Sequence, residues 1–104
     1  MGIFNNIFGG NTNDNLAKLV NEGAFLVDVR TPEEFAEGNV KESTNIPLDQ
    51  VAVNLDKFKG KEYIVVFCRS GNRSGQAKNI LEQNGFTNVT NGGTWQDIND
   101  VINK

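Results

Sequence analysis

Residues 63–74 of the chain read YIVVFCRSGNRS and contain its one cysteine, Cys68. The apolar run 63–67 is rich in β-branched and aromatic residues and is bounded by turn residues, which is typical of a parallel-sheet strand buried on both faces. From Ser74 onward the apolar residues follow helical spacing, and Gly85 is placed to end that helix. The pattern predicts a strand-to-helix turn that begins at Cys68 and aims several backbone N–H groups at one point.

The rest of the chain alternates between the strand period and the helix period. Strands are expected at 24–29, 43–46 and 88–90, and helices at 12–22, 31–38, 48–58 and 95–102, with Gly92 and Gly93 in a turn before the last helix. Thr31 and Glu34 form a capping box at the start of the second helix. This order predicts one α/β domain, residues 12–104, whose small parallel sheet of about five strands is covered by helices on both faces. Residues 1–11 are expected to be a loosely ordered N-terminal extension.

The composition removes several classes of function. One cysteine cannot form an internal disulfide, and a chain with no histidine and no C-x-x-C pair offers no zinc site, so we expect neither a metal nor a cofactor. A net charge of -3 with scattered basic residues argues against nucleic acid as a partner. Residues 1–10 lack the pattern of a secretory signal, and we expect no stable membrane insertion and a cytoplasmic location.

The turn that begins at Cys68 has the features of an anion site with a reactive thiol. Ligands of α/β sheets bind beyond the carboxyl ends of the strands, where Cys68 is expected to lie. Loop amides and a helix N-terminus favour a thiolate there, Arg69 and Arg73 add positive charge, and Gly71 permits a close backbone approach. Because the chain has no histidine, activation of the thiol must be electrostatic instead of by a general base.

Four spaced motifs of the chain resemble those of the rhodanese-type sulfurtransferases. The segment 68–74 is similar to the active-site loop of that family, 27–35 (VDVRTPEEF) to its first segment, 45–47 (NIP) to its second, and Gly92-Gly93 with Trp95 to its closing segment. The similarity spans residues 12 to 104. Where the family commonly has Gly-His-Ile, this chain has Gly38-Asn39-Val40. We expect this replacement to affect local packing more than catalysis.

The resemblance implies that sulfur is transferred through Cys68. The thiolate would take the outer sulfur of thiosulfate or of another small anionic persulfide donor, hold it as a persulfide, and pass it to a thiol, a protein acceptor or cyanide. The loop residues Arg69, Ser70, Gly71, Asn72, Arg73 and Ser74 would bind the donor. Asp28 and Arg30 would support the loop, with Asp28 orienting Arg73 or the loop amides. Trp95 is expected to pack in the core or at its rim, or to line the entrance of the site.

Two other functions stay open at this stage. Cysteine phosphatases and arsenate reductases also hold a thiolate in an anion-binding loop, but they use C-x-x-x-x-x-R, whereas Arg73 follows Cys68 here after four intervening residues. A non-catalytic rhodanese-fold binding or regulatory module would have the same fold. The retention of both Cys68 and Gly71 favours the enzyme over such a module.

Overall fold

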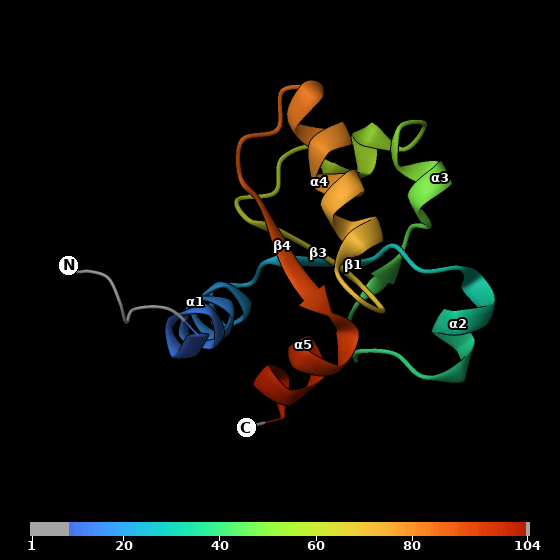
Figure 1. Ribbon diagram of the computed structural model, residues 1–104. Helices are drawn as coiled ribbons and strands as arrows, with labels where there is room; N and C mark the ends of the chain where they lie inside the picture. Colours follow the sequence, from blue (N-terminus) through green and yellow to red (C-terminus); the bar gives the residue numbers. More distant parts are fainter. Residues whose placement is uncertain (1–8, 104) are drawn as a thin grey trace.

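The computed structural model describes residues 9–103, with side chains from Asn15 onward. Its elements are α1 (Gly9–Asn21), β1 (Phe25–Asp28), α2 (Pro32–Glu37), β2 (Thr44–Asn45), α3 (Leu48–Val51), the 3-10 helix η1 (Leu55–Phe58), β3 (Ile64–Cys68), α4 (Asn72–Gln83), β4 (Val89–Thr94) and α5 (Trp95–Ile102). The strands form one parallel sheet in the order β2-β1-β3-β4 (Figure 1). The predicted α/β class is confirmed, and the described residues contribute four strands to the sheet instead of about five.

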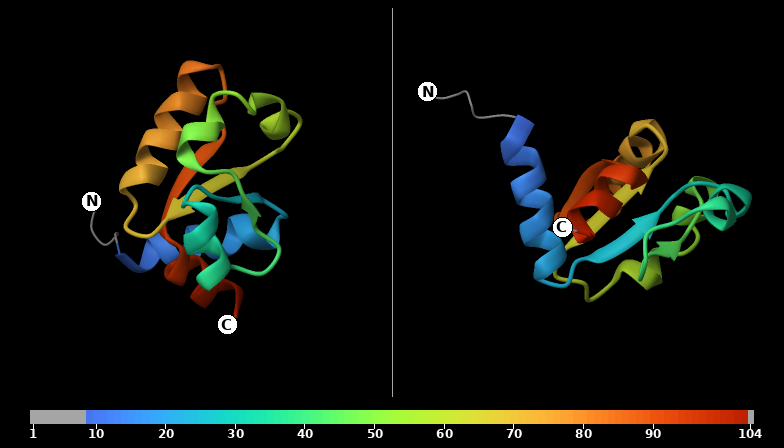
Figure 2. Two further views of the ribbon diagram at one scale, coloured as in Figure 1. Left: turned by 90° about the vertical axis from the view of Figure 1, so that its right-hand side faces the viewer. Right: turned by 90° about the horizontal axis from the view of Figure 1, so that it is seen from below.

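The sheet has a hydrophobic cluster on each face. Because successive residues of a strand point to opposite faces, Val66 and Cys68 of β3 belong to one cluster, and Val65 and Phe67 to the other. Residues of α3, η1 and α4 complete the first cluster, and residues of α1 and α5 complete the second, on the opposite side of the sheet (Figure 1 and Figure 2). All residues of β3 are buried, so the loop that follows this strand starts from a fixed base.

The prediction of a single helix over residues 48–58 is wrong, because the segment forms α3 and η1 with a break between them. At Asn54 the backbone leaves helical geometry, with φ −124° and ψ 30°. The Asn54 side-chain amide donates to the Gln50 carbonyl at 2.8 Å, and the Asn54 backbone N–H donates to the Val51 carbonyl instead. The side chain thus replaces the backbone donor that a continuous helix would need. Val51 and Phe58 still face the core, which preserves the apolar spacing.

The last strand, β4, is longer than predicted. Gly92 and Gly93 lie inside it and not in a turn. Asn91 and Gly93 pair with consecutive residues of β3, which leaves Gly92 as a β-bulge. A Cβ at Gly92 would lie 2.8 Å from side-chain carbons on both β3 and α5, closer than van der Waals contact allows. The glycine is therefore required by the packing of α5 against the sheet.

The helix ends follow the sequence signals closely. The capping box of Thr31 and Glu34 is confirmed. Gly85, with φ 94°, follows α4 as predicted, while α4 begins at Asn72, two residues before Ser74. Helix α1 begins at Gly9, before the predicted start; residues 1–8 of the predicted extension lie outside the described residues. Within residues 9–103, no helix is both long enough and apolar enough to cross a bilayer.

Candidate active site

Cys68 ends β3 and lies under a tight loop. Its side chain is fully buried, and the Gly71 N–H donates to its Sγ at 3.0 Å. Gly71 precedes α4 as its N-cap and has φ 94°, a left-handed conformation that favours glycine. The chain therefore turns back over the sulfur and places the first turn of α4 beside it, which is the strand-to-helix turn that the sequence predicts.

The surroundings of Cys68 favour its thiolate. Burial alone raises the pKa of the Cys68 thiol, but hydrogen bonds from the Ser74 hydroxyl and from the amides of Ser74, Ser70 and Gly71 outweigh burial, so the pKa lies below its ordinary value. Ser74 Oγ lies 3.5 Å from Sγ. Fixed donors at a loop and a helix start can activate a thiol without a general base, as a chain without histidine requires.

Asn91, which the sequence analysis did not single out, connects the loop to β4. Its Oδ1 accepts from Ser74 Oγ at 2.7 Å and from the Gly93 N–H at 3.0 Å, and its Nδ2 donates to the Gly71 carbonyl at 3.1 Å. One amide thus holds both the glycine that bends the loop and the serine beside the sulfur. No local motif joins Asn91 to the loop, because it lies 17 residues beyond Ser74 in a segment whose glycines indicated a turn.

Arg73 is oriented by Glu34 of α2. Its Nη1 and Nη2 donate to Oε1 and Oε2 of Glu34 at 2.7 and 3.0 Å. This bond, together with the one from the Thr31 N–H, lowers the pKa of Glu34 to about 2. The same bond raises the pKa of Arg73, and the charge of Cys68 makes a smaller contribution in that direction. The prediction that Asp28 orients Arg73 or the loop amides is wrong, because among the described residues the Asp28 carboxylate accepts only from Arg30. Glu34, which the sequence indicated only as a capping residue, orients Arg73 instead.

Asp28 pairs with Arg30 behind the loop. The Asp28 carboxylate accepts from Arg30 Nε at 2.9 Å and from Nη2 at 2.7 Å, and both side chains are buried. The other donors of the guanidinium reach the carbonyls of Glu34 and Gly38, at 3.2 and 2.7 Å. Its face stacks on Trp95, 4.7 Å from the ring centroid. The pair therefore fixes α2 and the start of α5 around the end of β1.

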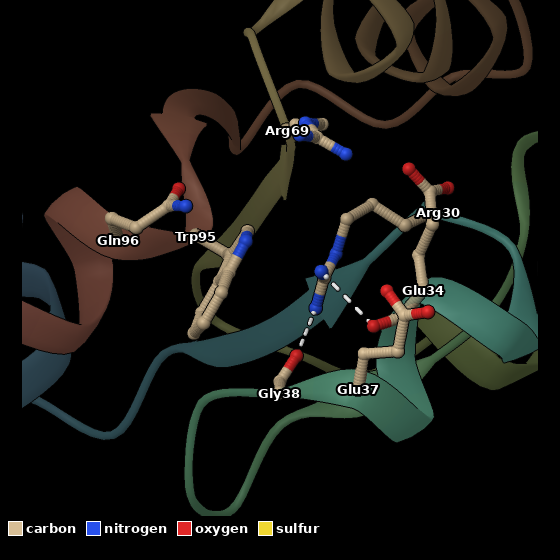
Figure 3. Close-up of a pocket in the computed structure, with 7 residues that line it drawn as sticks. All are labelled: Arg30, Glu34, Glu37, Gly38, Arg69, Trp95 and Gln96. Carbon is tan, nitrogen blue, oxygen red and sulfur yellow. Dashed lines mark hydrogen bonds between the residues drawn. The ribbon is translucent and has the colours of Figure 1, made fainter.

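A cavity of about 210 Å³ opens beside the loop (Figure 3). Its lining residues are Arg30, Glu34, Glu37, Gly38, Arg69, Trp95 and Gln96. Figure 3 shows the Arg30 guanidinium beside the Trp95 ring, with Arg69 on the loop above them. Arg69 is exposed, and within residues 15–103 it makes no side-chain hydrogen bond or ion pair. Its positive charge is therefore available to a guest in the cavity. Trp95 lines this cavity and also packs at the rim of the core, as predicted.

The remaining predicted residues lie on the surface of the loop. Ser70 and Asn72 are exposed, and Ser70 Oγ accepts weakly from the Asn72 N–H at 3.5 Å. Asn39, at the position of the usual family histidine, donates from Nδ2 to the Phe35 carbonyl at 2.8 Å and so closes the end of α2. In the part of the chain that the structure describes, no group of three or more acidic, histidine or cysteine side chains is arranged to hold a metal ion.

Comparison with known proteins identifies the family of the chain. The model of the rhodanese-like domain matches residues 12–93. The chain belongs to the rhodanese-like domain family. The thiosulfate sulfurtransferase PspE of Escherichia coli is 39% identical over 77 residues, which cover 69% of this chain and 71% of that protein. A sulfurtransferase of Allochromatium vinosum is 36% identical over 70 residues, which cover 67% of this chain and 65% of that protein.

A solved structure described as rhodanese with anions from E. coli agrees with the fold. It is 35% identical in sequence and has a TM-score of 0.66. The matched region covers 72% of this chain and 91% of the E. coli chain. The rhodanese resemblance inferred from the four motifs is confirmed. The relatives from E. coli and A. vinosum are both named as sulfurtransferases.

Proposed function

We propose that this rhodanese-like domain is a thiosulfate sulfurtransferase that carries sulfur as a persulfide on Cys68. The contact of 3.0 Å between the Gly71 N–H and Sγ carries the proposal, because an amide aimed at a sulfur atom beside a helix start stabilises an anion on it. The lowered pKa of Cys68 supports it, as do the names of the relatives.

In the first step the Cys68 thiolate attacks the outer sulfur of thiosulfate. A bond forms between Sγ and that sulfur, the S–S bond of thiosulfate breaks, and its electron pair leaves with sulfite. The thiolate and the thiosulfate dianion become a persulfide anion and a sulfite dianion, so charge is conserved. Sulfite leaves as a stable anion and needs no proton donor, which suits a chain without histidine.

We assign the attraction of the donor chiefly to Arg69. The charge of Arg73 is shared with Glu34 through two hydrogen bonds, whereas Arg69 is exposed on the loop and lines the cavity. A thiosulfate dianion that enters there meets the exposed guanidinium of Arg69. The anions in the description of the E. coli rhodanese structure are consistent with a small anionic donor.

In the second step an acceptor removes the outer sulfur. A thiolate or cyanide attacks the terminal sulfur of the persulfide, a new bond to that sulfur forms, and the electron pair of the broken S–S bond returns to Sγ. The amide of Gly71 and the hydroxyl of Ser74 then stabilise the thiolate that leaves. We propose a thiol or a protein as the physiological acceptor and the cytoplasm as the compartment.

Mass spectrometry after incubation with thiosulfate tests the proposal. We expect the protein to gain the mass of one sulfur atom and to form thiocyanate when cyanide is added. Cys68→Ser, which keeps the size and shape of the side chain, is the matched control and should gain nothing. A wild-type protein that gains no sulfur and forms no thiocyanate refutes the proposal and favours a non-catalytic binding or regulatory module. Cys68-dependent hydrolysis of an aryl phosphate refutes it in favour of the phosphatase.

A further inference from the structure

One hydroxyl hydrogen beside Cys68 has two possible acceptors. Ser74 Oγ lies 2.7 Å from Asn91 Oδ1 and 3.5 Å from Cys68 Sγ. The orientation of the Asn91 amide is fixed on both sides, because Oδ1 must accept from the Gly93 N–H and Nδ2 must donate to the Gly71 carbonyl. The serine therefore has to be the donor in its contact with Asn91. A hydroxyl has a single hydrogen, so it cannot donate to both acceptors at full strength.

The protonation state of Cys68 decides which acceptor is better. With a neutral thiol, the Ser74 hydroxyl donates to Asn91 at 2.7 Å, and the S–H can donate to the serine oxygen. When Cys68 loses its proton to solvent, the thiolate becomes a stronger acceptor for the Ser74 hydroxyl, because the hydrogen bond is then charge-assisted. Asn91 Oδ1 then keeps only the Gly93 N–H as its donor. Ser74 and Cys68 are both fully buried, so the exchange takes place between fixed groups.

We propose that Asn91 is a positioning residue for Cys68. The side-chain oxygen of Asn91 competes with the Cys68 thiolate for the single hydroxyl hydrogen of Ser74. Asn91 thereby sets how readily the thiol ionises, through a bond that β4 makes and that no loop residue supplies. This inference rests on the proposed function, in which Cys68 carries the transferred sulfur. Its test needs no sulfur donor, because the reactivity of the thiolate can be measured with an alkylating reagent.

Charged side chains on the elements around Cys68 also act on the thiolate and must stay unchanged in the test. They are Arg69 on the loop after β3, Arg73 in the first turn of α4, Asp28 at the end of β1 with Arg30 just beyond it, and Glu34 on α2. A neutral substitution at Asn91 alters none of these charges. Asn91 is itself exposed, so the change does not empty a core position.

Asn91→Leu removes the competing acceptor while nearly keeping the volume of the side chain. The Ser74 hydroxyl then donates to the thiolate without competition. We expect the pKa of Cys68 to fall by about half a unit to one unit, the equivalent of one neutral hydrogen bond. The pH dependence of alkylation by iodoacetamide measures this pKa, because only the thiolate reacts. Asn79→Leu, the same change at an exposed position of α4, is the matched control and should leave the pKa where it is.

A double-mutant cycle separates this competition from a purely structural effect. Ser74→Ala should raise the pKa of Cys68, and in that background Asn91→Leu should have no further effect, because the shared hydrogen is gone. If Asn91 only holds the loop in place through the Gly71 carbonyl, its loss raises the pKa or leaves it unchanged, and any effect persists with alanine at position 74. Either result overturns the proposal.

A measurement on the unmodified protein keeps the proposal testable if a variant does not fold. The side-chain amide resonances of Asn91 should shift with pH at the midpoint of Cys68 ionisation, because its oxygen loses a donor there, and should not do so in Ser74→Ala. Resonances that do not follow Cys68 in the wild-type protein refute the competition. A protein that passes both tests but transfers no sulfur from thiosulfate would refute the proposed function and leave this inference standing.

Discussion

Replacing Glu34 by glutamine tests the ion pair that joins α2 to α4. In the wild-type protein the Thr31 N–H donates to Glu34 Oε1 at 3.0 Å. Glutamine keeps an oxygen that can accept this bond, so the capping box survives the change. The substitution removes the negative charge from the bidentate contact with Arg73, whose two bonds measure 2.7 and 3.0 Å. We expect Glu34→Gln to lower the free energy of unfolding at neutral pH and to have no such effect in strong acid.

The size of the effect follows from the pKa of Glu34. The hydrogen bond from Arg73, followed by that from Thr31, lowers it from 4.5 to about 2. At about 1.4 kcal/mol per unit, the whole shift corresponds to roughly 3.5 kcal/mol, which is an upper limit. The two side chains are 31% and 23% exposed, so solvent screens part of the attraction. We therefore expect a loss of about 1–2 kcal/mol, above that of an ordinary surface pair because the contact is bidentate.

The pH dependence has a defined sign. In the unfolded chain Glu34 takes up a proton near its ordinary pKa of 4.5, whereas in the folded protein it stays ionised down to about 2. Its contribution to stability is therefore complete above the unfolded pKa and is lost as the pH falls from there through the folded value. The difference in unfolding free energy between the wild type and Glu34→Gln should be largest at neutral pH. It should vanish as the pH falls below the folded pKa of Glu34, about 2.

Urea unfolding followed by the fluorescence of Trp95, the one tryptophan, measures the difference across this range. Glu33→Gln, a neighbouring exposed carboxylate in the same helical turn, is the matched control and should change stability by less than about 0.5 kcal/mol. Equal losses for the two variants, or a gap for Glu34→Gln that does not change with pH, would refute the assignment of the shifted pKa to the pair with Arg73.

Further predictions concern the buried pair, the bulge and the cavity. Asp28→Ala leaves Arg30 buried without its partner, and we expect a loss of about 3–5 kcal/mol in urea unfolding; a loss below about 1 kcal/mol would contradict the described pairing. Gly92→Ala places a Cβ 2.8 Å from two side-chain carbons and should cost about 1–3 kcal/mol, whereas Gly75→Ala, with its Cβ at 3.5 Å inside α4, should be neutral or stabilising by up to about 1 kcal/mol. Equal effects of the two alanines would refute the packing argument. Arg69→Ala should raise KM for thiosulfate several-fold with a smaller change in kcat; the reverse pattern in steady-state kinetics would place Arg69 in the chemical step.

Local patterns were sufficient to predict the features that depend on neighbouring residues. The strand before Cys68, the turn at Gly71 and the capping box of Thr31 and Glu34 each rest on a few adjacent side chains, and the structure places all of them as expected. The same holds for Gly85, whose left-handed backbone follows the end of α4. Propensity and tertiary structure agree at these positions, so the sequence alone was informative.

Contacts between distant segments could not be predicted in this way. Arg73 meets Glu34 across 39 residues, and Ser74 meets Asn91 across 17, and no spacing rule selects either pair. The sequence predicted that Asp28 orients Arg73 or the loop amides, but the Asp28 carboxylate pairs with Arg30 beside it. The break in residues 48–58 was missed for a related reason, since the competing side-chain bond of Asn54 does not alter the apolar spacing.

The bulge at Gly92 also protects the molecule against pairing with other chains. Among the strands that the structure describes, β2 and β4 are the edges of the sheet. An edge strand that is long, flat and regular is a template for intermolecular strand addition. β2 has two residues, too few to serve as such a template. β4 is longer, but its ladder is interrupted by the extra residue, which bends and twists the strand. The irregularity that follows Asn91 in β4 therefore also makes this edge a poor template for strand addition.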